Sequence, residues 1–261
     1  REAINTFLLA DAEVVPHPVD EEGIVLNERP CDYYYVTPGH QVPTGVTMSS
    51  ARRRQLLDHA ARHDAVIIED DYDSESNFTL NPLPALKASD RSGRVVYVSS
   101  LSKALSPGLR LGFMVADPDL IDEARALRRL VYRHPPTNIQ YQMAHFLAQG
   151  HYETHLRRYH YDSAQRWERL HAALQRYLPS CRALAGSEHA NAFWLQTPAQ
   201  INTQQLTWRA AHAGVLIEPG ARHFLSAAPP DNYFRMGFHA INPDAIAQGV
   251  EVLRGQLEQM G

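Results

Sequence analysis

The segment VVYVSSLSKALSPGLRLG, residues 95–112, places a chemically active stretch between two apolar runs. We expect strands at Arg94–Val98 and Leu111–Ala116, so Lys103 lies where the chain leaves a buried strand. A lone lysine is most often a solvated surface residue, because burying an ammonium is costly. Here Arg110 follows the lysine and three hydroxyls precede it, from Ser99, Ser100 and Ser102. These groups can donate to a phosphate ester, so the segment predicts a lysine that forms an imine with a phosphorylated carbonyl cofactor.

A second signal is the segment VIIEDDYD, residues 66–73, in which an apolar strand runs directly into acidic residues. Ligands of open α/β sheets bind at the carboxyl ends of the strands, so these carboxylates are expected to face a ligand. A carboxylate there could keep a pyridine nitrogen protonated and make the ring an electron sink. Taken alone, the cluster could equally hold a metal or cap a helix, but the lysine segment favours the first interpretation.

Short apolar runs alternate with amphipathic stretches through the first half of the chain, which is typical of parallel strands joined by crossover helices. The predicted fold class is therefore α/β. Ser49 is the expected N-cap of a helix that ends near Arg62. After Pro118 the pattern becomes helical. The other strands expected in this half are Glu13–Val15, Tyr33–Val36 and Ala65–Glu69, and the helical stretch is interrupted at residues 134–136 and at Gly150.

The rest of the chain predicts a second lobe. We expect a large domain over residues 1–150 and a smaller α+β domain over residues 151–261. The expected elements of the second lobe are strands at Ala192–Leu195, Val215–Glu218 and Phe234–Phe238, a helix near Thr203–Ala213 and a final helix from Pro243.

Composition excludes several classes of function. The net charge is only −4, so no chain-wide positive field attracts nucleic acid. The two cysteines, Cys31 and Cys181, are far apart and lack metal-ligand spacing, which makes the cytoplasm the expected compartment. No apolar run approaches the length of a membrane span, so no membrane role is expected. The chain begins with Arg1 and enters at once into a helical pattern at Ala3–Ala12, which we interpret as a fragment without its N-terminal part.

Four short motifs resemble one family. They are HQ-x-PTG at residues 40–45, IEDDYDSE at 68–75, SK-x-L-x-PGLRLG at 102–112 and RHPP at 133–136. Their order is similar to that of fold type I pyridoxal-phosphate enzymes of the aspartate-aminotransferase type. More narrowly, they resemble the aminotransferase-like domain of MocR/GabR-type regulators in the GntR superfamily. The resemblance implies a mostly parallel sheet with helices on both faces, followed by a smaller α+β domain.

The resemblance also assigns roles to individual residues. Lys103 becomes the Schiff-base lysine for pyridoxal phosphate, Asp70 the partner of the pyridine nitrogen, and Tyr72 a donor to the ring hydroxyl. The implied phosphate ligands are Ser100, Ser102 and Arg110. Arg235, in the segment NYFRMGF at residues 232–238, becomes the clamp for a substrate or effector carboxylate, although an exposed salt-bridging arginine is an open alternative.

Three further residues lie in the loop that faces the ring in this family. His40 and Gln41 receive no role. Val42 stands where most aminotransferases of this fold have an asparagine, which fits the regulator branch better than an efficient transaminase. A glycine-rich phosphate loop and a ring-stacking aromatic residue are expected to precede the chain.

Two functions use these same residues. In the first, an amino acid or amine effector displaces Lys103 from the cofactor, and the change is passed to a DNA-binding winged helix that lies N-terminal to this chain. In the second, the protein is a genuine aminotransferase in which Lys103 acts as general base. A third possibility keeps the fold without the cofactor, as a scaffold or dimerisation module. The resemblance implies a homodimer.

Overall fold

The computed structural model describes residues 2–27, 29–73, 75, 83–184 and 191–260. The chain divides into two compact units, and each is described by itself. Residues 22–41 and 47–162 form one, called here the β3–β6 unit, and residues 1–21, 42–46 and 163–261 form the other, the β8–β10 unit. The predicted domains, 1–150 and 151–261, stay a prediction.

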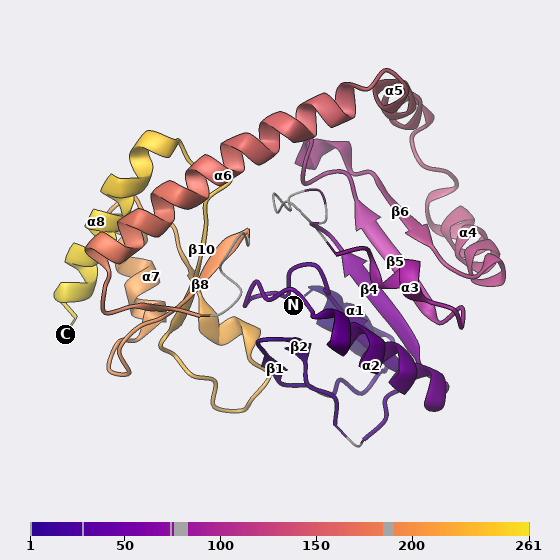
Figure 1. Cartoon of the computed structure of the whole chain (residues 1–261), viewed down its shortest axis with the longest axis horizontal. Helices are drawn as coiled ribbons and strands as arrows, with labels where there is room; N and C mark the ends of the chain where they lie inside the picture. The colour runs from indigo at the N-terminus through magenta and orange to yellow at the C-terminus, as the bar shows by residue number, and fades with distance from the viewer. Residues whose placement is uncertain (1, 28, 74, 76–82, 185–190, 261) are drawn as a thin grey trace. The chain divides into compact units, whose positions relative to one another are not determined.

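A four-stranded sheet forms the centre of the β3–β6 unit, in the order β3-β4-β5-β6. The strands β3 (Tyr33–Val36), β4 (Val66–Asp71) and β5 (Val95–Ser100) run parallel, and β6 (Gly112–Val115) is antiparallel to β5. Figure 1 shows β4, β5 and β6 side by side, in purple to magenta. The alternation of parallel strands and helices predicted from the sequence is therefore confirmed for β3, β4 and β5.

Helix α2 (Ser50–Arg62) covers part of this sheet. Its predicted N-cap is confirmed, because the side chain of Ser49 accepts the Arg52 N–H at 3.1 Å. Leu56 of the helix is fully buried and belongs to the same apolar core as Ile67 of β4. Each such side chain contributes about 1.5–3 kcal/mol of burial free energy, so this core fixes the positions of the strand ends. The short helix α3 (Leu86–Ser89) precedes β5.

The chain then continues through α4 (Pro118–Tyr132), α5 (Thr137–Ala148) and the long α6 (His151–Tyr177). The breaks fall at the residues predicted, since α5 begins directly after the two prolines and Gly150 adopts a φ of +71° before α6. Glycine tolerates this left-handed conformation because it has no Cβ. Within the described part of the chain, none of the helices combines the length and apolar character that crossing a membrane requires.

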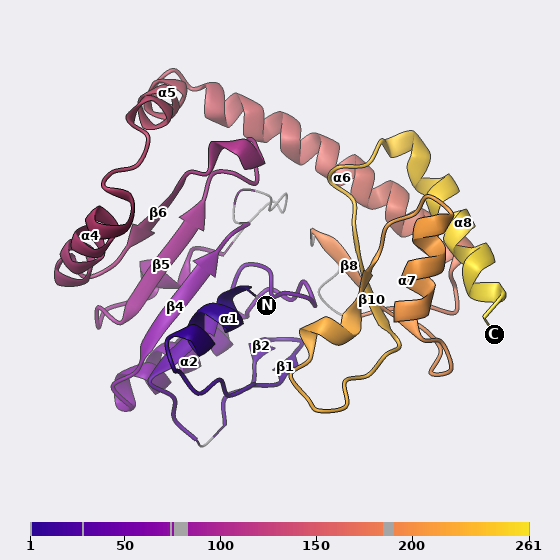
Figure 2. The same cartoon turned by 180° about the vertical axis from the view of Figure 1, so that it is seen from behind.

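The β8–β10 unit is built on a second sheet, in the order β7-β8-β10-β9, whose neighbours all pair antiparallel. The strands are β7 (Arg182–Ala183), β8 (Ala192–Gln196), β9 (Glu218–Pro219) and β10 (Tyr233–Gly237). Helices α7 (Thr203–His212) and α8 (Ile246–Glu258) contact each other, and both lie beside the sheet in Figure 2. This unit also contains α1 (Glu2–Leu9), in place of the expected Ala3–Ala12.

Two predicted strands are wrong. Residues 12–18, which include the expected strand Glu13–Val15, have no regular structure, and only the short β1 (Val19–Asp20) and β2 (Gly23–Ile24) follow. Pro16 and Pro18 cannot donate to a sheet ladder, which explains why the strand expected at Glu13–Val15 does not form. The strand expected at Val215–Glu218 is reduced to Glu218–Pro219, because the Val215 N–H donates to the Ala210 carbonyl at the end of α7.

Candidate functional site

Polar side chains gather where β3, β4 and β5 end. The three strands are parallel, so their carboxyl ends meet at one edge of the sheet. The Tyr72 hydroxyl, just after β4, donates to the carbonyl of His40, after β3, at 3.1 Å. The Ser99 hydroxyl of β5 donates to the Asp71 carbonyl at 2.9 Å. These bonds join the three chain segments that the sequence motifs singled out.

Lys103 lies in a turn after β5, with its side chain 35% exposed. Its Nζ lies 2.6 Å from Oδ1 of Asp73 and 4.4 Å from the centre of the Tyr72 ring. The second oxygen of Asp73, Oδ2, lies 3.6 Å from Nδ1 of His40. The predicted Schiff-base lysine and Tyr72 are therefore brought together, and a buried carboxylate lies between the lysine and a histidine.

The loop that carries Lys103 is held from both ends. The Leu101 N–H donates to the Leu111 carbonyl at 3.0 Å, and the Leu111 N–H donates to the Ser102 hydroxyl oxygen at 3.3 Å. At Gly112 a Cβ would lie 2.6 Å from the Ser99 carbonyl oxygen, so a side chain there would force the backbone apart. The glycine that closes the lysine motif thus permits close pairing of β5 and β6.

The three predicted phosphate ligands lie in this same loop and the strand before it. The Ser102 N–H donates to the Ser100 hydroxyl oxygen at 3.2 Å, which places the two serines together. Because each hydroxyl oxygen accepts a backbone N–H, its own hydrogen remains a donor for an anion. Arg110 is exposed and adopts a left-handed conformation, with φ 48° and ψ 40°, at the turn into β6.

The acidic cluster at the end of β4 divides into separate tasks. Glu69 is almost fully buried and accepts the N–H groups of Leu86 and Lys87, at 2.6 and 2.8 Å, at the first turn of α3. Asp71 accepts the Tyr97 hydroxyl at 2.7 Å. The helix-capping alternative is therefore correct for Glu69. In the described part of the chain, no group of three or more His, Cys, Asp or Glu side chains is placed to hold a metal ion.

Asp70, the predicted partner of the pyridine nitrogen, accepts a hydrogen bond from the Tyr35 hydroxyl of β3. Burial raises the pKa of Asp70, although the hydrogen bond from Tyr35 opposes this shift. Burial, followed by the bond to Asp70, also raises the pKa of Tyr35. A carboxylate that is partly desolvated in this way gains most from a cation placed beside it.

Two neighbours of this site received no role from the sequence, Asp73 and Tyr35. Asp73 belongs to the quoted acidic segment, but its partners depend on the path of the turn after β4, which no motif reveals. Tyr35 lies in a run of three tyrosines, Tyr33–Tyr35, and only the register of β3 against β4 shows which one reaches Asp70.

Arg235, the predicted carboxylate clamp, belongs to the β8–β10 unit. Its Nη1 lies 3.4 Å from Oε2 of Glu218, its partner across β9 and β10. Glu218 also faces Arg222 at 3.4 Å and His223 at 3.3 Å. A hydrogen bond from His223, together with the charges of Arg235 and Arg222, lowers the pKa of Glu218 to about 2. Three basic side chains thus share one carboxylate.

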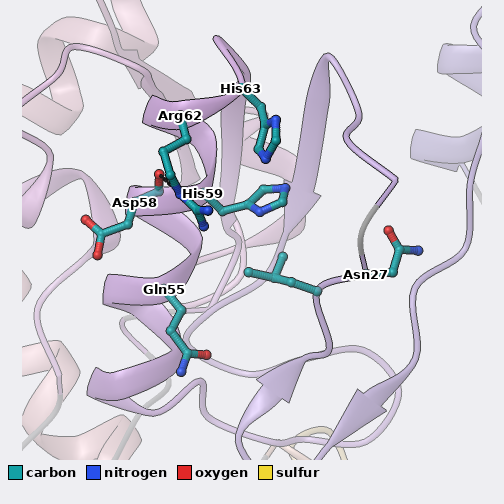
Figure 3. Close-up of a pocket in the computed structure, with 7 residues that line it drawn as sticks. Asn27, Gln55, Asp58, His59, Arg62 and His63 are labelled. Carbon is teal, nitrogen blue, oxygen red and sulfur yellow. Dashed lines mark hydrogen bonds between the residues drawn. The ribbon is translucent and has the colours of Figure 1, made fainter.

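A separate surface hollow of about 580 Å³ lies along α2 (Figure 3). Its lining residues are Leu26, Asn27, Gln55, Asp58, His59, Arg62 and His63. His59 is buried, and its Nε2 lies 2.8 Å from the Tyr34 hydroxyl. None of the predicted site residues lines this hollow, so it does not belong to the lysine site.

The side chains at the strand ends fit pyridoxal phosphate in kind. Lys103 offers an amine for the aldehyde, and Asp70 offers a carboxylate that a protonated pyridine nitrogen would stabilise. Ser100 and Ser102 offer hydroxyl donors for the phosphate, beside the guanidinium of Arg110.

Comparison with known families and proteins agrees with this set of side chains. Residues 36–253 match the family described as aminotransferase class I and II. The HTH-type transcriptional regulator TauR of Rhodobacter capsulatus is 39% identical over 92% of this chain and 50% of its own length. The probable rhizopine catabolism regulatory protein MocR of Rhizobium meliloti is 35% identical over 97% of this chain and 52% of its own length. The chain spans about half the length of these relatives, and the predicted resemblance to MocR-type regulators is confirmed.

Solved structures agree on the fold. LysN, the alpha-aminoadipate aminotransferase of Thermus thermophilus, superposes with a TM-score of 0.90 at 27% identity, over 99% of this chain and 68% of LysN. The kynurenine aminotransferase of Pyrococcus horikoshii gives a TM-score of 0.89 at 26% identity, over 98% of this chain and 66% of that enzyme. The first was solved with N-(5'-phosphopyridoxyl)-L-leucine and the second in complex with PMP. They confirm the predicted fold type and support the predicted cofactor.

Proposed function

Since the chain belongs to the aminotransferase class I and II family, we propose that it binds pyridoxal phosphate through Lys103 and senses an amino compound as part of a MocR-type transcriptional regulator. The observation that carries this proposal is the cluster around the Lys103 amine, at the carboxyl ends of three parallel strands. The names of the two regulators, TauR and MocR, support the regulatory role.

Each residue of the cluster has a proposed task. When bound, the cofactor supplies an aldehyde for the lysine amine and an electron-withdrawing ring. Asp70 would hold a proton at the ring nitrogen, and the Tyr72 hydroxyl, which donates to the His40 carbonyl, would be the donor to the ring hydroxyl. Ser100, Ser102 and Arg110 bind the phosphate through hydroxyl and guanidinium donors.

The proposed clamp for the acid group of the effector is Arg235. Its side chain is 24% exposed, and its distance to Glu218 is long for a charge-assisted hydrogen bond. A carboxylate from an effector could therefore join the guanidinium without removing a tight internal partner. The proposed assembly is a cytoplasmic homodimer that contacts DNA through a winged helix outside this chain.

Absorbance spectra of the full-length protein test the proposal. Mixing it with pyridoxal phosphate should produce the yellow band of a lysine imine, and borohydride reduction should leave the cofactor mass on the peptide that contains Lys103. Lys103→Ala should lose both signals. Lys87→Ala is the matched control, because Lys87 is the other lysine of this chain and pairs with Asp90 at 3.1 Å.

A colourless mixture, or a band that survives Lys103→Ala, would contradict the proposal. Addition of single amino acids and amines then separates the two functions. A sensor shows a spectral shift without release of a keto acid, whereas an aminotransferase releases one keto acid for each amino group transferred.

A further inference from the structure

The carboxylate of Asp73 lies where the segments after β3, β4 and β5 meet. Its side chain is only 2% exposed, and Lys103 Nζ and His40 Nδ1 lie 2.6 and 3.6 Å from its two oxygens. Among the described residues, the titratable groups near this pair include Tyr72, whose ring faces the amine, Glu75, whose charge repels that of Asp73, and His155 of α6, whose ring bonds to the carbonyl of Ala104.

This arrangement favours the protonated amine. A buried carboxylate is expensive unless a cation compensates it, and the 2.6 Å contact with Lys103 provides that compensation. The face of the Tyr72 ring also attracts an ammonium. An ammonium has no lone pair with which to attack an aldehyde, so the same contact that stabilises the pair restrains the lysine chemically.

We propose that Asp73 is the resting partner of the Lys103 amine, a positioning residue that holds it whenever it is not bonded to the cofactor. Asp73 thereby sets the pH at which the cofactor is captured and stabilises the state in which an effector amine has displaced the lysine. This inference rests on the proposed function of Lys103.

The displacement balances without any further reactant. The nitrogen of the incoming ammonium forms a C=N bond to the carbon that carried Lys103, and the bond from that carbon to Nζ breaks. In the protonated imine Nζ already carries one proton, and two protons of the incoming ammonium pass to it, so the lysine leaves as an ammonium. The third proton stays on the new imine nitrogen, and nothing is oxidised or reduced. The departing charge then returns to the carboxylate of Asp73.

Chemical labelling of the cofactor-free, full-length protein tests the role of Asp73 without any cofactor chemistry. An acylating reagent modifies only the neutral amine, and mass spectrometry of the digest reports Lys103 and Lys87 separately. At neutral pH, Asp73→Asn should raise the labelling rate of Lys103 about tenfold, as expected when one charged partner is lost, and leave Lys87 unchanged. Asp73→Glu, which keeps the carboxylate, should restore slow labelling.

Asp71→Asn is the matched control, because it removes an equal charge two residues away from a carboxylate that bonds to Tyr97. Equal Lys103 labelling in the wild type and Asp73→Asn, or acceleration by Asp71→Asn to the same extent, would overturn the inference. If Asp73→Asn does not fold, the wild type alone provides the test. The labelling rate of its Lys103 should rise with pH, with a midpoint at higher pH than that of a free lysine side chain. A midpoint at the same or a lower pH would overturn the inference.

Titration with the cofactor distinguishes a failure of this inference from a failure of the proposed function on which it rests. With pyridoxal phosphate present, the yellow band of Asp73→Asn should appear at a pH about one unit lower than that of the wild type. A difference in labelling in a protein that never forms the band would refute the proposed function of Lys103 while supporting its pairing with Asp73.

Discussion

Both units of the molecule place a cation against a carboxylate, but they do so differently. In the β3–β6 unit, Lys103 lies 2.6 Å from Asp73, whose side chain is 2% exposed. In the β8–β10 unit, Arg235 lies 3.4 Å from Glu218, whose side chain is 32% exposed and shared with Arg222 and His223. The first pair is tight and its carboxylate is buried, so its chemistry depends on whether the contact is made or broken. The second has a longer contact and a more exposed carboxylate, in keeping with the proposal that its arginine receives the acid group of an effector.

In the β3–β6 unit, each of the three neighbouring carboxylates of β4 also binds a different partner, whereas Glu218 is shared by three basic side chains. Asp70 accepts from Tyr35, Asp71 from Tyr97 and Glu69 from two backbone N–H groups, although the three residues are consecutive. Alternation along a strand sends Asp70 to the face opposite that of Glu69 and Asp71, and the latter two reach different partners at different positions along that face. Substitution of each acid should therefore change a different property of the protein.

The largest effect is expected for Asp70→Ala. Removing the charged partner of a buried cation typically costs about 3–5 kcal/mol, so the affinity of the full-length protein for pyridoxal phosphate should fall by about two to four powers of ten. Absorbance titration measures this change. The control is Asp71→Ala, which removes the neighbouring carboxylate and should leave the affinity within about tenfold. Near-normal affinity in Asp70→Ala would show that another group faces the ring nitrogen.

A smaller effect, confined to stability, is expected for Glu69→Gln. The amide keeps one acceptor oxygen but turns an N–H₂ group toward a backbone N–H of Leu86 or Lys87, so one charge-assisted bond becomes a clash of donors. We expect a loss of about 2 kcal/mol in the free energy of unfolding. The melting temperature of the transition that unfolds this domain should fall by about 4–8 °C.

Thermal unfolding of Glu69→Gln in the full-length protein checks this value, and cofactor affinity measured well below the melting temperature should stay near that of the wild type. Loss of affinity without loss of stability would show that Glu69 serves the cofactor rather than α3. That result would contradict the expectation that each carboxylate of β4 affects a different property of the protein.

The sequence predicted the strands that carry the site because their apolar runs are continuous and end in polar residues. It also predicted α2, whose cap depends only on Ser49 and the residues that follow it. It failed at Glu13–Val15, where β-branched residues suggested a strand but the nearby Pro16 and Pro18 cannot donate to a sheet ladder. Propensity reports what a segment can form, whereas pairing requires a neighbour with available backbone groups.

The site was predictable in part for the same reason. Lys103 and Tyr72 lie next to strand ends, so their meeting follows from the parallel order of β4 and β5. The contact of Asp73 with Lys103 depends on two turns whose conformations are set by tertiary packing. The pairing of Glu218 with Arg235 depends on the register of β9 and β10, which the shortened strand at Glu218–Pro219 obscured.

The smallest effect is expected at the loose pair of the β8–β10 unit. The pKa of Glu218 is lowered to about 2 in the folded protein, below the ordinary value of 4.5, so its charge stabilises the fold above pH 4.5 and loses this effect as the pH falls toward 2. Because about a third of the side chain is exposed, solvent screening limits the contribution to about 1 kcal/mol. Glu218→Gln should therefore lower the free energy of unfolding by that amount at pH 7, and the difference from the wild type should shrink as the pH is lowered from 4.5 toward 2.

Urea denaturation at several pH values measures this difference. The matched control is Glu251→Gln, which replaces an exposed acid 3.8 Å from Arg254 and should cost less stability at every pH. A difference that stays constant as the pH falls would mean that Glu218 acts through packing, and the contrast between the two ion pairs would then not be electrostatic.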